Sequence, residues 1–192
     1  MVTVRNSRQD VIKAAGRLFA EKGYHGTSMR DLGRELGLLG SSLYAHVESK
    51  QDLLVEVVEE GARLFHASAD AALAAGGSSS DRLRQLIAGH IGVVLENPDV
   101  VRTYLNEARM LDAEHRSRVI AARDAYEQTF RQAIGAGISD ATFRPDLDPK
   151  LSSIFLLSIL NALERWYRPD GAVDGSQLVD EVTEFALAAL KH

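Results

Sequence analysis

The stretch between Thr27 and Lys50 constrains the fold of this chain more than any other part of the sequence. Thr27 is a residue type that caps helix N-termini, because its hydroxyl accepts from free backbone N–H groups. Met29, Leu32 and Leu36 follow at a spacing that places three apolar side chains on one face of a short helix. The pattern predicts a short amphipathic helix that packs against a second element.

A second short helix is predicted directly after the first. Gly37 ends the first helix, and the second runs from about Gly40 to His46, with Leu43 and Val47 as the side chains that it can bury. Two short helices joined by a glycine-bearing turn are typical of the DNA-binding helix-turn-helix. An αα-hairpin in an ordinary helical bundle is the alternative.

The outward-facing residues favour DNA binding, since hydroxyl, imidazole and ammonium groups suit phosphate oxygens and base edges. Ser49, with Asp52 three residues on, starts another helix and places Lys50 at its N-terminus, where backbone N–H groups and an ammonium group bind one phosphate together. We expect DNA contacts from Thr27, Ser28, Arg30, Leu39, Gly40, Ser41, Ser42, Tyr44, His46 and Lys50.

This region resembles the N-terminal domain of TetR/AcrR-type repressors over about residues 8–55. The resemblance rests on Ile12-x-x-Ala15-x-x-Leu18-Phe19, Gly23-Tyr24-x-x-Thr27-Ser28-Met29, Leu36-Gly37-Leu38 and Ser42-Leu43-Tyr44-x-His46-x-x-Ser49-Lys50-x-x-Leu53-Leu54. It implies a homodimer that places two recognition helices in successive major grooves of a roughly palindromic double-stranded operator. Leu39 and Gly40 replace the Ser or Thr and the polar or basic residue that are common there, so we expect modest direct readout of bases and more dependence on DNA shape.

The charge distribution agrees with a DNA-binding N-terminal region. The net charge is −5, yet residues 1–50 hold eight Lys/Arg and five Asp/Glu, a net of +3, which leaves −8 for residues 51–192. A basic segment on an acidic protein presents one face to DNA and repels it elsewhere. We therefore expect a DNA-binding domain over residues 1–50 and a helical effector-binding and dimerisation domain over residues 51–192.

Helical periodicity recurs along the rest of the chain and predicts an all-α fold. The expected helices run from about Ser7 to Gly23, from after Ser49 to about Ala75, from Asp81 to just before Asn97, from about Val100 to Leu105, in a long stretch from about Ala108 to Gly135, from Pro149 to about Arg168 and from about Gln177 to Leu190, with a linker over 76–80. The helix that begins at Pro149 is apolar on nearly every side, and such a helix must be covered on more than one face. We expect this helix and the last one to form a four-helix interface with a second chain.

Several functional classes are excluded or disfavoured. The chain has no Cys, no signal sequence and no apolar run long enough to span a bilayer, so a cytoplasmic protein without a membrane segment is expected. None of the common catalytic or phosphate-binding motifs occurs, which argues against an enzyme. The six His residues lack ligand spacing, and His66, His90 and His115 are interpreted as satisfied core histidines. We expect no metal and no cofactor.

A finer resemblance suggests the effector. Glu107-x-Arg109-x-Leu111, Arg123-x-x-Tyr126, Phe143, Asn161 and Trp166-Tyr167-Arg168-Pro169-x-Gly171 resemble the TetR/AcrR-type regulators that sense acyl-CoA thioesters in lipid, aromatic-acid or steroid breakdown. An acyl-CoA needs an apolar slot for its acyl chain and cations for its phosphates. The resemblance implies ligand contacts from Arg109, Arg116, Tyr126, Phe130, Asn161 and Trp166.

Four arginines recur every seven residues, at 102, 109, 116 and 123, and share one face wherever the helix is continuous. The alternative is a solvated face whose arginines pair with Asp112, Glu114 and Glu127. The rival functions are a regulator of efflux or detoxification that senses a hydrophobic drug-like compound, a regulator without an effector, and a helical ligand-binding protein that binds no DNA.

Overall fold

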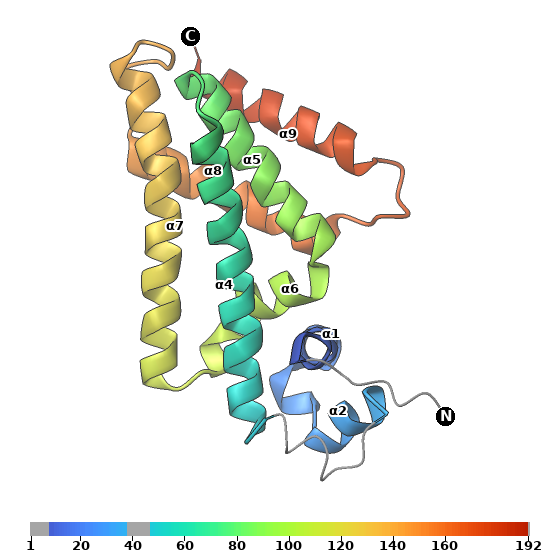
Figure 1. Ribbon diagram of the computed structural model, residues 1–192. Helices are drawn as coiled ribbons and strands as arrows, with labels where there is room; N and C mark the ends of the chain where they lie inside the picture. The colour runs from blue at the N-terminus through green and yellow to red at the C-terminus, as the bar shows by residue number, and fades with distance from the viewer. Residues whose placement is uncertain (1–7, 38–46, 192) are drawn as a thin grey trace. The chain divides into compact units, whose positions relative to one another are not determined.

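The computed structural model describes residues 8–37 and 47–191, and in these ranges every regular element is a helix (Figure 1). The all-α prediction is therefore confirmed. The predicted recognition helix, from about Gly40 to His46, lies outside the described residues, as does the N-terminal segment that carries Arg5. Among the described helices, none combines the length and apolar composition that a membrane crossing requires.

The chain forms two compact units. The head unit comprises residues 1–62 and 99–120, and the body unit comprises residues 63–98 and 121–192. Two long helices, α4 (Lys50–Ala75) and α7 (Ala113–Ser139), each contribute residues to both units. The predicted division at residue 50 concerns function rather than compactness, and it stays a prediction.

The head unit contains α1 (Arg8–Gly26), α2 (Met29–Glu35), α6 (Pro98–Asn106) and the 3₁₀ turn η1 (Ala108–Met110), with the adjoining parts of α4 and α7. Its core includes Val11, Ala15, Leu18 and Phe19 of α1 together with Leu32 of α2. The hydroxyl of Thr103 on α6 donates to the carbonyl of Gly16 on α1 at 3.0 Å, so α6 is bonded directly to the first helix.

Glycine permits one close helix approach in the head unit. A Cβ at Gly61 of α4 would lie 2.7 Å from the Cβ of Tyr104 on α6, which is shorter than real contacts allow. Glycine also permits the backbone to leave α1 at Gly23, where φ is 74° and ψ is 163°, and to end α2 at Gly37, where φ is 64°. Both glycines stand where the sequence predicts the ends of helices.

The body unit contains the rest of α4 and α7, together with α5 (Ser79–Glu96), α8 (Pro149–Trp166) and α9 (Gly175–Leu190). Helix α5 packs against both α8 and α9 (Figure 1). Asp148 caps α8 by accepting from the N–H of Leu151 at 2.9 Å, and Pro149 follows it as the first helical residue. This start of α8 is as the sequence predicts.

The predicted start of α5 is wrong by two residues. Ser78, not Asp81, is the N-cap: the N–H of Asp81 donates to the Ser78 hydroxyl at 3.2 Å, and the Asp81 carboxylate accepts from the Ser78 N–H at 3.1 Å. Asp81 is thus the third residue of a capping box. The predicted linker over 76–80 is correspondingly shorter, because the helix begins at Ser79.

The prediction of one helix from about Ala108 to Gly135 is also wrong. The turn η1 ends at Met110, and α7 begins only at Ala113, where the Asp112 carboxylate accepts from the N–H of His115 at 2.9 Å. Helix α7 then runs past Gly135 to Ser139. The break separates the predicted stripe of arginines, because only those at 116 and 123 lie on α7.

Candidate functional site

The described part of the predicted DNA-binding face lies at the start of α2. Ser28 is the N-cap of this helix, and its hydroxyl accepts from the N–H of Asp31 at 3.1 Å while the Asp31 carboxylate accepts from the Ser28 N–H at 3.0 Å. The Ser28 hydroxyl also donates to the Asp31 carboxylate, and this hydrogen bond, followed by the one from the Ser28 N–H, holds the pKa of the Asp31 carboxyl below its ordinary value. Arg30 is exposed beside them and makes no ion pair within the part of the chain that the structure describes.

Thr27 is not the helix cap that its residue type suggests. Its side chain is 1 % exposed, and its hydroxyl lies 3.1 Å from the carbonyl oxygen of Leu18 and 3.0 Å from that of Gly23. The hydroxyl therefore ties the start of α2 to α1, while Ser28 takes the capping position. A contact between Thr27 and a phosphate stays a prediction.

Lys50 opens α4, as the Ser49 and Asp52 pattern predicts, since the Asp52 N–H donates to the Ser49 hydroxyl at 3.1 Å. Its ammonium group donates to the carbonyl oxygens of Tyr24 at 2.9 Å and Thr27 at 2.8 Å, and it lies 4.3 Å from the centre of the Tyr24 ring. An ammonium group has three donors. Two of them position the end of α1 against α4, so a phosphate contact from Lys50 would use the third.

Tyr24 connects this corner of the head unit to the segment after α6. Its N–H donates to the Glu107 carboxylate at 3.0 Å and its hydroxyl donates to the Gln51 amide oxygen at 2.8 Å. The Gln51 amide nitrogen lies 3.4 Å from the carbonyl oxygen of Met110. Burial, and then the charge of Asp52, raise the pKa of the Tyr24 hydroxyl above its ordinary value. Sequence reasoning assigned none of these links, because each joins residues that are far apart in the chain.

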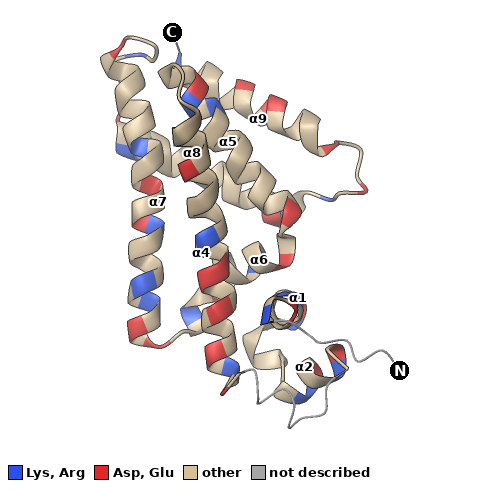
Figure 2. Cartoon of the chain, in the orientation of Figure 1, with Lys and Arg blue, Asp and Glu red and all other residues tan. Residues whose placement is uncertain are grey.

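Ion pairs offset part of the positive charge of the N-terminal region (Figure 2). Arg8 pairs with Glu56 of α4 at 2.8 Å, and Arg17 pairs with Glu35 of α2. Leu39, Gly40, Ser41, Ser42, Tyr44 and His46 lie outside the described residues, so their predicted DNA contacts stay predictions.

The body unit has a buried group of rings at its centre. Phe65 of α4, His90 of α5, and Tyr126 and Phe130 of α7 form this aromatic cluster, with ring centres 4.6 Å apart for Phe65 and His90 and 5.4 Å apart for Tyr126 and Phe130. All four residues are at most 7 % exposed. The cluster contains two of the predicted ligand residues and a histidine that sequence reasoning assigned to the core.

The other predicted ligand residues are distributed differently. Asn161 is half-buried on α8, Trp166 is 55 % exposed at the end of that helix, and Arg109 and Arg116 are exposed residues of the head unit. The structure thus brings together Tyr126 and Phe130 within the body unit. A shared role for all six residues stays a prediction.

The acidic residues expected to neutralise an arginine face have other partners. Asp112 accepts from the His115 ring at 2.7 Å, and Glu127 pairs with Arg131 at 3.2 Å. Arg109 and Arg116 make no ion pair with any residue in 8–37 or 47–191. In the same ranges no three His, Asp or Glu side chains are grouped as a metal site would need.

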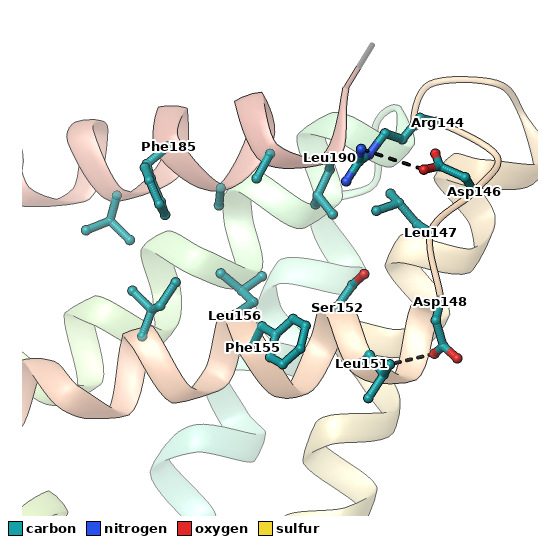
Figure 3. Close-up of a pocket in the computed structure, with 14 residues that line it drawn as sticks. Arg144, Asp146, Leu147, Asp148, Leu151, Ser152, Phe155, Leu156, Phe185 and Leu190 are labelled. Carbon is teal, nitrogen blue, oxygen red and sulfur yellow. Dashed lines mark hydrogen bonds and ion pairs between the residues drawn. The ribbon is translucent and has the colours of Figure 1, made fainter.

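An apolar groove lies between α8 and α9 (Figure 3). It has a volume of about 380 Å³, and Phe155 of α8 and Phe185 of α9 line it although they are 62 % and 64 % exposed. At one end of the groove the guanidinium of Arg144 lies 3.7 Å from the Asp146 carboxylate. Exposed large apolar side chains on two neighbouring helices are typical of a surface that another molecule covers.

Two family models match the chain, one in its N-terminal part and one over most of the remainder, including residues 99–120 of the head unit. The family model for bacterial regulatory proteins of the tetR family matches residues 11–57, and that for the tetracyclin repressor-like C-terminal domain matches residues 76–190. The HTH-type transcriptional repressor KstR2 of Rhodococcus jostii (strain RHA1) is 27 % identical over 184 residues, which are 95 % of this chain and 90 % of that protein.

Two solved structures are similar over nearly the whole chain. The ketosteroid transcriptional regulator KstR2 of Mycobacterium tuberculosis has a TM-score of 0.91 and 25 % identity, covering 100 % of this chain and 97 % of that one. AibR, solved in complex with isovaleryl coenzyme A and operator DNA, has a TM-score of 0.84 at 24 % identity, covering 93 % of this chain and 96 % of that one, a likeness that shows the fold alone. The chain belongs to the tetR family and is a DNA-binding transcriptional regulator rather than an enzyme.

Proposed function

We propose that this protein is a homodimeric repressor that binds a roughly palindromic operator and leaves it when it binds a small hydrophobic effector, best an acyl-CoA thioester. Such a regulator acts in the cytoplasm, where its operator is. The observation that carries the choice of effector is the pair of exposed arginines, Arg109 and Arg116, which lack ion-pair partners among the described residues. An arginine that no carboxylate neutralises is available to the phosphates of coenzyme A.

The names of relatives support the same effector class. AibR was solved with isovaleryl coenzyme A and operator DNA together, and the KstR2 regulator of M. tuberculosis is described as a ketosteroid transcriptional regulator. Isovaleryl coenzyme A and a ketosteroid each have an apolar part and an uncharged carbonyl group. We extend this class to the present protein as a proposal.

The groove between α8 and α9 supports the homodimer. Leu151, Phe155 and Ile159 of α8 and Phe185 of α9 line it, and each of them is at least 41 % exposed. A second copy that presents the same two helices covers these side chains symmetrically, as a two-fold interface requires. Replacing Phe155 and Phe185 by Ser should therefore yield monomers in sedimentation experiments, whereas Leu73→Ser, at an exposed apolar residue of α4, should leave the dimer intact.

The proposal is tested by measuring binding to the DNA upstream of the protein's own gene, at fixed salt, with and without a panel of acyl-CoAs. Selective binding that one chain-length class releases is the expected result, and linkage then requires that DNA weaken acyl-CoA binding by the same factor. Selective binding that no acyl-CoA alters would refute the effector and retain the repressor. A protein that selects no sequence from random DNA would refute the repressor.

The arginines provide a matched pair of variants. Removing the guanidinium at Arg116 should weaken acyl-CoA binding by about tenfold, because a hydrogen bond to a charged group contributes about 1.5–3 kcal/mol. Arg118→Ala is the control, since Arg118 lies on the same helix and is already paired with Glu59 at 3.6 Å. Equal acyl-CoA affinity in both variants would contradict a phosphate contact from Arg116.

A further inference from the structure

The imidazole of His90 is the most deeply buried titratable group of the aromatic cluster. His90 is 1 % exposed, and its ring centre lies 4.6 Å from that of Phe65, 5.9 Å from that of Tyr126 and 6.4 Å from that of Phe130. Its Nδ1 lies 3.1 Å from the Tyr126 hydroxyl oxygen. One ring nitrogen is therefore hydrogen-bonded inside the cluster.

The second ring nitrogen, Nε2, makes no hydrogen bond in the described part of the chain. Within residues 8–37 and 47–191, Nε2 of His90 is fully buried and has no hydrogen-bond partner. If the Tyr126 hydroxyl donates to Nδ1, Nε2 carries a proton without an acceptor; in the other tautomer, Nε2 is an acceptor without a donor. Either arrangement lowers the free energy of unfolding by about 1–3 kcal/mol. A histidine at this position is therefore better explained by a function than by stability.

A neighbouring histidine shows the ordinary arrangement. Nε2 of His66 on α4 lies 2.9 Å from the carbonyl oxygen of Ala122, and the His66 ring packs edge-on against Tyr126 with centres 5.7 Å apart. The same ring system thus contains one imidazole whose Nε2 is satisfied by backbone and one whose Nε2 is not. The prediction that His90 is a satisfied core histidine is wrong for this one atom.

Burial also determines what His90 can recognise. It lowers the pKa of His90 from 6.5 to about 3, so the ring is neutral near pH 7. A neutral N–H in apolar surroundings suits an uncharged acceptor such as a ketone or thioester carbonyl oxygen. A carboxylate would have to enter the same surroundings with its charge desolvated, which is far more costly.

We propose that Nε2–H of His90 donates a hydrogen bond to an uncharged carbonyl oxygen of the effector, while the Tyr126 hydroxyl donates to Nδ1 and so fixes the tautomer. This inference rests on the proposed function, in which the protein binds an acyl-CoA effector. It assigns to His90 the polar contact that orients the apolar acyl part of the effector in the aromatic cluster. Because His90 is almost inaccessible, the rings must part to admit the carbonyl group, and association should be slower than unhindered encounter.

The test compares octanoyl-CoA and isovaleryl-CoA with the S-alkyl thioethers in which a methylene group replaces the carbonyl group. Calorimetry on the full-length wild type should give about tenfold tighter binding of each thioester, as expected for one net hydrogen bond. His90→Phe should bind thioester and thioether equally. His66→Phe is the matched control, and it should keep the preference because the Nε2 of His66 already has a partner.

A second measurement does not depend on coenzyme A. In protein labelled with ¹⁵N at histidine, the nitrogen shifts of His90 should report the Nε2–H tautomer, and the Nε2 resonance should move when the bound ligand contains a carbonyl group. Androst-4-ene-3,17-dione serves as a ketone without phosphates. Retained operator binding and helical circular dichroism show that each variant is folded.

The outcomes separate the two proposals. A wild type that binds thioesters and thioethers equally, or a His90→Phe variant that keeps the preference, overturns the role of His90 and leaves the acyl-CoA effector standing. Failure of every CoA compound to bind the wild type refutes the acyl-CoA effector. The nitrogen spectrum then decides for His90: a shift with the ketone supports the contact, and an Nε2 resonance that no carbonyl compound moves overturns it.

Discussion

The two units differ in the pairing of some of their buried polar groups. In the head unit, Lys50 donates to two backbone carbonyl oxygens, and the hydroxyl of Thr27 is within hydrogen-bond distance of two more. In the body unit, His90 has one paired and one unpaired nitrogen, and the hydroxyl of Thr183 on α9 is buried without a partner among the described residues. Hydrogen bonds from Lys50 and Thr27 hold the end of α1 against α2 and α4. In the body unit, by contrast, some buried polar atoms have no hydrogen-bond partner among the described residues.

The difference matches what each unit has to do. A polar network in which every member is satisfied specifies one geometry, which suits a scaffold that presents residues to DNA at fixed positions. An unpaired buried group reduces stability until something else pairs with it. The comparison therefore predicts that removing a paired buried polar group in the head unit costs stability, whereas removing an unpaired one in the body unit costs little or nothing.

The largest effect is expected at Lys50. Lys50→Met keeps most of the aliphatic stem but removes the donor to Tyr24 and Thr27, so we expect the free energy of unfolding to fall by about 2–3 kcal/mol in urea titrations. If the third N–H also binds a phosphate, DNA affinity should fall for all sequences. The slope of log affinity against log salt concentration should then become shallower by the contribution of about one phosphate contact. An unchanged free energy of unfolding would show that the hydrogen bonds of Lys50 do not stabilise the contact between the end of α1 and α4.

Acid pH should reveal the neutral His90. Its pKa is about 3 in the folded protein and about 6.5 in the unfolded chain, so between these values the unfolded state binds a proton that the folded state does not. Stability should fall as pH is lowered through this window, by about 2 kcal/mol between pH 6.5 and pH 5. His90→Phe should remove that loss and His66→Phe should not. If the free energy of unfolding depends on pH in the same way in both variants, a group other than His90 causes the loss.

Two buried threonines provide a direct test of the comparison. Thr27→Val removes the one hydroxyl donor that lies within hydrogen-bond distance of two carbonyl oxygens in the head unit, and should lower the free energy of unfolding by about 1–2 kcal/mol. Thr183→Val removes a hydroxyl that has no partner in the described part of the chain and should leave stability equal or higher. A greater loss of unfolding free energy in Thr183→Val than in Thr27→Val would contradict the difference between the two units.

The smallest effect is expected at the cap of α2. Ser28→Ala removes the acceptor for the Asp31 N–H, and loss of an N-cap costs about 1 kcal/mol. Ser158→Ala, on an exposed face of α8 where the hydroxyl only donates back to Ile154, should cost less. Equal melting temperatures of the two variants would show that α2 does not depend on its cap.

Several helix ends were predictable from neighbours in sequence, although the local caps at Ser78 and Asp112 were missed. Ser49 with Asp52, Asp148 with Pro149, and the stop at Gly37 all stand as expected, because a cap or a positive φ is a local requirement. The periodicity of apolar residues likewise indicated α8 and its unsatisfied outer face. Family resemblance in the head region added the function, through motifs that are contiguous in the chain.

The sequence did not predict which of two adjacent residues with similar side chains takes a structural role. Thr27 and Ser28 both have a hydroxyl that can cap a helix, and the contact with the Leu18 carbonyl oxygen, nine residues away, decides which of them does. Apolar residues continue in helical register across Leu111, yet η1 and α7 are separate elements with Asp112 at the new start. Local pattern contains no information about such distant partners.

The sequence by itself therefore predicted the all-helical class, the starts of α4 and α8 and the family, because these depend on short-range periodicity and on motifs. Only the tertiary structure decided which polar groups are satisfied: the ammonium group of Lys50 is bound to carbonyl oxygens at the end of α1, and the Nε2 atom of His90 is left open. Hydrogen bonding inside a protein depends on which atoms from separate helices come within about 3 Å of one another, and packing sets those distances.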